Sequence, residues 1–243
     1  MSFLLPSMYA VDQLPLQSDE LEVLNALVPL SNQSIVELGC GNALLARNLL
    51  QRFPGCQVTG LEVDAVQHAK NLTQPQAGLN FVTAGAQDVP FPDAMFDLAL
   101  MLKSLHHVPL PLLSKALAEV ARVLKPGGHF YVSEPIYDGA FNEVLKIFND
   151  EGVVRAAAQA ALDEALTTSG DWETVTERSF ALQMPFSSFD DFEQRMMRPT
   201  YAQHDLSEAV MARVHAEFKR HLTPEGARLV LPIHVRLFRR TGA

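Results

Sequence analysis

Residues 35–43 read Ile-Val-Glu-Leu-Gly-Cys-Gly-Asn-Ala, a short apolar strand with an acid near its end, followed by a glycine turn. This order builds a nucleotide-sized cradle at the carboxyl edge of the first strand of an α/β sheet. Gly39 and Gly41 suit a turn in which a Cβ atom would obstruct the backbone or a ligand. The helix expected next, at 43–52, would direct its free N–H groups toward the cradle. Taken alone, the segment is equally compatible with an ordinary strand–turn–helix connection.

Short apolar runs alternate with amphipathic helical patterns over the first 135 residues. Strands are expected at 34–38, 56–61, 79–83, 96–101 and 129–134, and helices at 18–30, 43–53, 65–72 and 111–124. The last of these helices is expected to end at the breaker cluster 125–128, Lys-Pro-Gly-Gly. Alternation with short loops predicts a doubly wound parallel sheet with helices on both faces.

The alternation ends after Pro135. Helices are expected at 139–169, 188–198 and 205–221, and two further strands at 174–184 and 229–239. Two late strands separated by helices indicate an edge pair with an inserted cap. We expect one domain with a core formed by 1–135, 171–185 and 228–243, and helical substrate-cap insertions at 136–170 and 186–227.

Composition limits the functional classes. The chain has 243 residues, 48% of them hydrophobic, and a formal net charge of −9. It therefore lacks the basic surface expected of a protein that binds nucleic acid mainly through the phosphates. Arg236, Arg239 and Arg240 form the densest basic cluster and are expected to be solvated strand positions rather than a binding patch. Cys40 and Cys56 have neither metal-ligand spacing nor the number needed for a disulfide scaffold.

Targeting signals are not evident in the sequence. The first six residues carry no basic segment followed by a long apolar core, and no run approaches 18 apolar residues. We therefore expect a cytoplasmic protein that lacks a membrane span.

A second acidic segment, Gly60-Leu61-Glu62-Val63-Asp64, ends the second expected strand about 20 residues after the glycine turn. A carboxylate here can accept two hydrogen bonds from the vicinal hydroxyls of a ribose. Glu62 is the better candidate because it ends the apolar run, whereas Asp64 is expected to cap the next helix. The alternative for Glu62 is a solvated loop acid.

Five segments, in order and with normal spacing, make the chain resemble a class I S-adenosylmethionine-dependent methyltransferase of the small-molecule type. They are Glu37-Leu38-Gly39-Cys40-Gly41, Gly60-Leu61-Glu62-Val63-Asp64, residues 87–97, Leu105-His106-His107-Val108 and residues 122–128. The resemblance covers 34–135, and the remainder carries no comparable signature. It implies a Rossmann-like, doubly wound, seven-stranded and mostly parallel sheet with an antiparallel last strand and a helical cap.

The resemblance also implies positions for the cofactor, S-adenosylmethionine. Its methionine part would be surrounded by Glu37, Gly39, Cys40 and Gly41, its ribose held by Glu62, and its adenine met by Val63, Ala86 and Gln87. Leu102 would face the amino and sulfonium region, and Tyr9 would close the site from the N-terminal arm.

Two departures from the family pattern bear on these positions. Ala43 stands where a further glycine is common, and Gly85 stands where an aspartate often precedes the adenine-edge residue. Dinucleotide-binding folds prefer the motif G-x-G-x-x-G, and this chain has Leu44 where the third glycine would stand. This difference argues against a dehydrogenase.

Methyl transfer mainly requires in-line alignment of nucleophile, methyl and sulfur, with a base where the acceptor is a hydroxyl or an amine. His106 and His107 are candidates for that base, and their alternative is a structural role in a common turn. Candidate acceptor-binding residues are Lys103, Arg195, Arg198, Tyr201 and His204, for which the alternative is an ordinary surface loop.

We therefore expect an enzyme that transfers a methyl group from S-adenosylmethionine to a small-molecule O-, N- or C-nucleophile. The expected protein uses no metal, is a monomer or homodimer, and has no nucleic-acid or membrane partner. The alternatives are methylation of tRNA or protein, and a non-catalytic protein that binds the cofactor on the same fold.

Overall fold

The structure is a computed structural model that describes residues 11–200 and 202–242, so Tyr9 and Tyr201 lie outside the described residues. Contacts divide the described chain into two compact units. The core unit comprises 21–134, 151–178 and 235–242, and the second unit comprises the remaining segments, 11–20, 135–150 and 179–234. The expected assignment of 136–170 to a cap stays a prediction, although contacts group the later part of this segment with the core unit.

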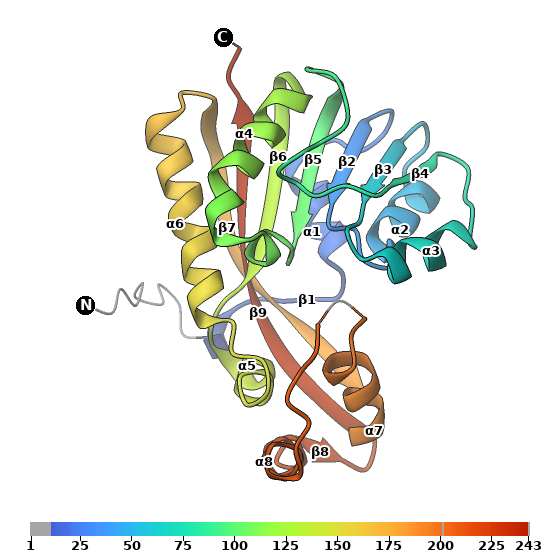
Figure 1. Cartoon of the computed structure of the whole chain (residues 1–243), viewed down its shortest axis with the longest axis vertical. Helices are drawn as coiled ribbons and strands as arrows, with labels where there is room; N and C mark the ends of the chain where they lie inside the picture. Colours follow the sequence, from blue (N-terminus) through green and yellow to red (C-terminus); the bar gives the residue numbers. More distant parts are fainter. Residues whose placement is uncertain (1–10, 201, 243) are drawn as a thin grey trace. The chain divides into compact units, whose positions relative to one another are not determined.

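Among the described residues the sheet has nine strands, and its seven longer strands run in the order β7-β9-β6-β5-β2-β3-β4 (Figure 1). Their bounds are β2 Ser34–Leu38, β3 Gln57–Leu61, β4 Leu79–Val82, β5 Phe96–Leu102, β6 Leu124–Pro135, β7 Trp172–Phe186 and β9 Gly226–Arg240. The five strands from β4 to β6 pair in parallel. The predicted mostly parallel sheet is therefore confirmed, and two strands of two residues each are present beyond the seven expected.

Arginines at the end of β9 show its direction. Arg240 donates to the carbonyl of Leu124 at the start of β6, and Arg239 pairs with Glu173 at the start of β7. The end of β9 thus lies beside the starts of both neighbours, so the last strand is antiparallel, as predicted. The expectation of a solvated basic cluster is wrong for Arg236, which is buried and pairs with Asp163 and Glu177.

Helices flank the sheet of the core unit. They are α1 Glu20–Leu27, α2 Leu44–Arg52, α3 Ala65–Leu72, α4 Leu113–Val123 and α6 Gly152–Thr168, with short 3-10 turns at Leu105–His107 and Leu110–Leu112. Buried residues of α4 recur at three- and four-residue spacing, as in Ala116 and Val120, and α6 adds Ala158 and Leu162 to the same apolar cluster. These residues pack on the face of the sheet that carries Val36. The helices α2 and α3 contact the other end of the strand order, at β3 and β4.

The start of β6 differs from its prediction. Phe96 pairs with Leu124 and Leu98 pairs with His129, so the Lys-Pro-Gly-Gly cluster forms a bulge inside the strand rather than a loop before it. Gly127 has a φ of 78°, a backbone conformation that glycine adopts without a steric penalty.

The second unit contains α5 Gly139–Leu145, α7 Phe189–Phe192, a π-helical turn at Glu193–Met197 and α8 Glu208–Lys219. A 3-10 turn, Val11–Gln13, and the short strands β1 Leu16–Gln17 and β8 Leu222–Thr223 complete it. Its core is a cluster of phenylalanine rings that includes Phe186, Phe192 and Phe218. The helix predicted at 139–169 is two helices, because the polar stretch around Asn149 and Asp150 interrupts it.

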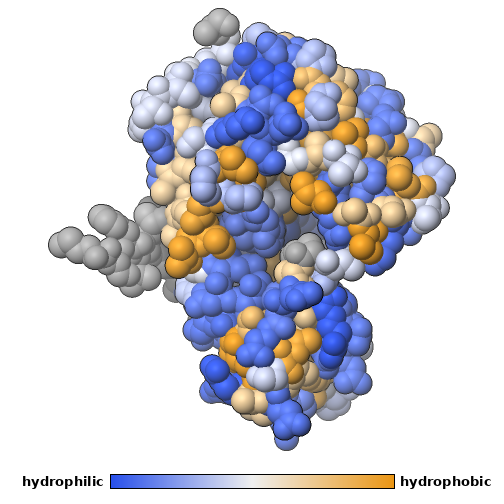
Figure 2. All heavy atoms as spheres, viewed as in Figure 1, coloured by the Kyte–Doolittle hydropathy of each residue, from blue (hydrophilic) through white to orange (hydrophobic). Residues whose placement is uncertain are grey.

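Figure 2 shows hydrophilic and hydrophobic residues interspersed over the visible face. Within the described residues, no helix is both long enough and apolar enough to cross a bilayer.

Candidate functional site

The glycine turn after β2 lies where the strand order reverses, between β2 and β5. Backbone N–H groups of Gly39 and Cys40 both donate to the carbonyl of Leu61, at 2.9 Å each, which ties the turn to the end of β3. Gly39 has a φ of 76°, and a Cβ atom on it would lie 2.8 Å from the Cβ of Ser104. Gly41 has a φ of 51°, and no atom lies within 4 Å of the position that its Cβ would take. The turn is therefore packed on the side of Gly39 and open on the side of Gly41.

Glu62 joins the turn to the loop after β3. Its side chain is buried, with Oε2 accepting from the Gly41 N–H at 2.8 Å and Oε1 accepting from the Asp64 N–H at 2.8 Å. Asp64 in turn accepts from the Val66 N–H at 2.9 Å and caps α3, as predicted. Since a carboxylate has about four acceptor sites, Glu62 retains the capacity to accept further hydrogen bonds.

Asn71 belongs to this site and was missed in the sequence. It is a buried side chain of α3, and its Nδ2 donates to the Gly41 carbonyl at 2.7 Å. Thus Glu62 holds the N–H of Gly41 and Asn71 holds its carbonyl. The sequence does show Asn71 as a polar residue on the inward side of an amphipathic helix. It does not show the partner, because Gly41 lies 30 residues earlier in the chain.

Cys40 is a packing residue in the turn. Its Sγ would lie 2.8 Å from a Cβ placed on Gly60, so the thiol fills the space that this glycine leaves. Burial, and secondarily the charges of Glu37 and Glu62, raise the pKa of Cys40 well above its ordinary value. The raised pKa favours the neutral thiol over the nucleophilic thiolate.

The two departures from the family pattern have local explanations. Ala43 has a φ of 56°, so it adopts the left-handed conformation that a glycine would take at the same position before α2. A Cβ on Gly85 would lie 2.5 Å from the side-chain amide atoms of Gln87. The Gln87 side chain therefore occupies the space beside the backbone into which a residue-85 side chain would extend.

The remaining candidate cofactor residues lie in the same unit. Glu37 and Ala86 are buried, Val63 has 66% of its surface exposed in the loop before α3, and Leu102 ends β5. Their contact with a cofactor stays a prediction.

The second cluster follows β5. The Nδ1 atom of His106 hydrogen-bonds Glu134 Oε2, and the other oxygen of Glu134 accepts from the Leu105 N–H at 3.0 Å. Both side chains are buried, and the His106 and His107 rings lie 4.1 Å apart between centroids. The Nε2 atom of His106 lies 3.7 Å from Glu151 Oε2.

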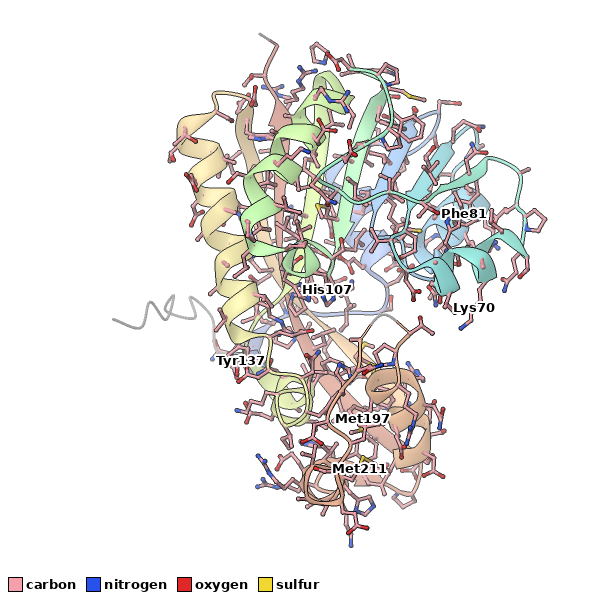
Figure 3. All side chains as sticks on the ribbon, viewed as in Figure 1. Lys70, Phe81, His107, Tyr137, Met197 and Met211 are labelled. Atoms are coloured by element: carbon pink, nitrogen blue, oxygen red, sulfur yellow. The ribbon has the colours of Figure 1, made fainter. Side chains whose placement is uncertain are left out.

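Glu151 is tied to its own helix by Arg155, whose NH2 group lies 2.6 Å from Glu151 Oε2. Desolvation of the His107 ring by surrounding protein, aided by the neighbouring His106, lowers the pKa of His107 below its ordinary value. His107, labelled in Figure 3, is nevertheless in contact with solvent.

The candidate acceptor-binding residues divide between the units. Lys103 follows β5 with a φ of 56°. In the second unit, Arg195 donates to the Pro185 carbonyl at 2.7 Å, Arg198 pairs with Glu193, and His204 bonds the Met197 carbonyl at 3.1 Å. Their role in binding an acceptor stays a prediction.

These features define a class of protein. An open parallel sheet binds its ligands outside the carboxyl ends of its strands, where the strand order reverses. Here the glycine turn after β2 and Ser104 after β5 meet at that point, and Glu62 follows the adjacent strand. The core unit therefore has a doubly wound α/β fold with a candidate ligand site at this edge of the sheet.

A family model described as "Methyltransferase domain" matches residues 36–132. This segment belongs to the methyltransferase-domain family, which confirms the resemblance to S-adenosylmethionine-dependent methyltransferases seen in the sequence.

Individual comparisons agree with this assignment. A fatty-acid O-methyltransferase of Mycolicibacterium smegmatis is 38% identical over 117 residues, which cover 46% of this chain and 42% of that protein. A demethylmenaquinone methyltransferase of Chlamydia trachomatis is 32% identical over 124 residues, or 49% of this chain and 53% of that protein. The chain thus spans about half the length of these curated relatives. The YcgJ protein of Bacillus subtilis shares the fold, with a TM-score of 0.61, 15% identity, and coverage of 92% of this chain and 98% of that one.

Proposed function

We propose that this protein transfers a methyl group from S-adenosylmethionine to a small-molecule acceptor. The observation that carries the proposal is the pair of hydrogen bonds by which Glu62 holds the N–H of Gly41 and Asn71 holds its carbonyl, beside an open space. Such a fixed, open glycine backbone next to a buried acid suits the methionine and ribose parts of the cofactor. The family match over 36–132 supports the same chemistry.

The residues present fit this cofactor. Gly41 leaves the space that a Cβ would fill, and Glu62 can accept from ribose hydroxyls in addition to its two backbone donors. Gln87 supplies an amide for the adenine edge where Gly85 has no side chain, and Val63 offers an exposed apolar surface to a ring. When bound, S-adenosylmethionine supplies a methyl group already activated by its sulfonium.

The protein's contribution to transfer is then alignment and, for a protic acceptor, removal of a proton. His106 is committed by Nδ1 to Glu134, so we assign it the positioning of its neighbour. We assign proton removal to His107, which follows β5 and contacts solvent. Lys103 of the core unit, which follows β5, is proposed to select an anionic acceptor.

A small molecule is favoured over tRNA because the net charge of −9 opposes phosphate binding. The two relatives named above act, by their names, on a fatty acid and on demethylmenaquinone. We propose an acceptor of comparable size, and leave its identity to a metabolite panel assayed for methyl transfer.

The central test is calorimetric titration with S-adenosylmethionine and with its demethylated product. We expect both to bind, and Glu62→Gln to weaken binding on the order of 10- to 100-fold, since a charge-assisted hydrogen bond contributes about 1.5–3 kcal/mol. The matched control is Glu208→Gln, a change of the same type at an exposed residue of α8.

Failure of both ligands to bind would contradict the proposal. Cofactor binding with no turnover across the panel would instead identify a non-catalytic binding protein.

A further inference from the structure

We infer that Gln87 recognises the purine of the cofactor through its side-chain amide, so that the site binds a hypoxanthine nucleoside nearly as well as an adenine nucleoside. The inference rests on the proposed function and adds the base selectivity of the same site. It is carried by the turn at 85–88, which follows β4 in the core unit.

The turn at 85–88 lies on the side of Glu62 that is away from the glycine turn. The strands β2, β3 and β4 are parallel neighbours in that order, and the Glu62 N–H donates to the Val82 carbonyl at the end of β4, at 3.1 Å. The proposal places the methionine part at the turn after β2 and the ribose at Glu62 after β3. The base, which is attached to the ribose, is then expected at the loop that follows the next strand, β4.

The backbone of this turn is fixed by the protein. The Asp88 N–H donates to the Gly85 carbonyl at 3.1 Å, which closes the turn. Ala86 is buried in the apolar cluster of the core unit, and both backbone groups of Val89 are hydrogen-bonded to side chains of α4, at 2.9 Å each. Gln87 lies between these anchors, so a ligand that binds its side chain need not order the turn.

The amide of Gln87 folds back over Gly85. A Cβ atom on Gly85 would lie 2.5 Å from both Oε1 and Nε2 of Gln87, so glycine at 85 leaves this space to the amide. The Gln87 side chain is half-buried, and within the described part of the chain neither amide atom has a hydrogen-bond partner. The acceptor and the donors of this amide are therefore all available to a ligand.

An amide and a carboxylate differ in how they meet the 6-position of a purine. Adenine carries an amino donor there, whereas a 6-oxopurine such as hypoxanthine carries a carbonyl acceptor. An ionised carboxylate only accepts hydrogen bonds, so it matches the amino group and repels the carbonyl oxygen. The last torsion of glutamine is broad and roughly two-fold, so Gln87 can turn its oxygen to the amino group or its NH₂ to the carbonyl. An aspartate at position 85 would select adenine, whereas Gly85 with Gln87 accommodates both bases.

The test is calorimetric titration of the full chain with S-adenosylhomocysteine and with S-inosylhomocysteine, its counterpart with hypoxanthine in place of adenine. We expect the two dissociation constants to agree within about 10-fold, because the amide offers each base one neutral hydrogen bond. Gln87→Ala should weaken the binding of both ligands by about 3- to 10-fold, which corresponds to the loss of that bond.

A double variant reverses the selectivity. Gly85→Asp/Gln87→Ala exchanges the amide for a carboxylate at the same place, and Gly85 accepts a side chain because its φ is outside the left-handed region. This variant should retain S-adenosylhomocysteine and weaken the binding of S-inosylhomocysteine by more than about 100-fold, since a carboxylate then faces a carbonyl oxygen.

Asp88→Asn is the matched control, because Asp88 is the exposed carboxylate next to Gln87 and the alternative partner for a 6-amino group. Its selectivity between the two ligands should equal that of the wild-type chain, and circular dichroism checks that each variant is folded. Failure of both ligands to bind the wild-type chain would contradict the proposed function itself.

Three results would overturn the inference while leaving the proposed function intact. They are binding of S-adenosylhomocysteine with S-inosylhomocysteine more than about 100-fold weaker, unchanged affinities in Gln87→Ala, and a selectivity that changes in Asp88→Asn.

Discussion

Backbone strain at single residues is concentrated near the ends of β2 and β5. Ala43 and Lys103 both have positive φ angles, 56° in each case, although neither is glycine. A left-handed conformation costs an ordinary residue about 1–2 kcal/mol. In an Ala43→Gly variant, loss of the buried methyl group would offset part of the stability gained by removing the left-handed strain. Lys103 is the cleaner case because its long side chain is not part of the apolar core.

We predict that Lys103→Gly raises the free energy of unfolding by about 1 kcal/mol, because it removes the left-handed penalty. Urea denaturation followed by circular dichroism measures the change. Lys115→Gly is the control. It places glycine in the first turn of α4, where the substitution should lower stability by up to about 1 kcal/mol. A loss of stability in both variants would show that the Lys103 side chain outweighs its backbone strain.

Between elements, Arg122 of α4 fixes the loop between β4 and β5. It donates to the carbonyls of Val89 and Phe91 and to the Glu119 carboxylate, which itself accepts from the Val89 N–H at 2.9 Å. Two of the five family-like segments, 87–97 and 122–128, are thus joined physically by one guanidinium group. The fork of Arg122 has several donors in a plane, so lysine cannot replace it.

The pH dependence of this clamp has a definite sign. Hydrogen bonds from Arg122 hold the pKa of Glu119 below its ordinary value of 4.5. A carboxyl group with a lowered folded-state pKa contributes stability above its unfolded pKa and loses it as pH falls through the folded value. We predict that Glu119→Gln lowers unfolding free energy by about 1–3 kcal/mol at pH 7 and progressively less below pH 4.5. Urea unfolding from pH 7 to pH 3 measures it, and a pH-independent difference would contradict it.

The elements themselves were largely predictable, and the site was predictable only in part. Apolar runs and glycine or proline breaks placed β2 and α3 at their observed bounds, because these signals are local. The start of β6 at Leu124 and its bulge have no local signal, because the pairing with β5 extends the strand through the proline and glycines of 125–128. Likewise Glu62 follows from its spacing to the turn, whereas Asn71 and Glu151 reach their partners only through the packing of helices.

At the scale of the molecule, three strands, β6, β7 and β9, carry residues of both compact units. In the core unit, Phe130, Trp172 and Phe238 join these strands, with ring centroids 5.5–6.3 Å apart. Leu162 of α6 belongs to the same apolar cluster. Because Phe238 is 2% exposed, its truncation creates a cavity that the neighbouring rings cannot fill without moving.

We therefore predict that Phe238→Ala lowers the free energy of unfolding by about 3–5 kcal/mol. The thermal midpoint should fall on the order of 10 °C, given about 2–4 °C per kcal/mol for a chain of this size. Differential scanning calorimetry measures the shift, with Val175→Ala as control because this β7 side chain is 47% exposed. Equal midpoints for the two variants would mean that β9 contributes to the sheet through its backbone and arginine pairs rather than through its ring. A large fall of the thermal midpoint for Phe238→Ala, with little change for Val175→Ala, would show that the aromatic cluster stabilises the packing of β9 on the sheet.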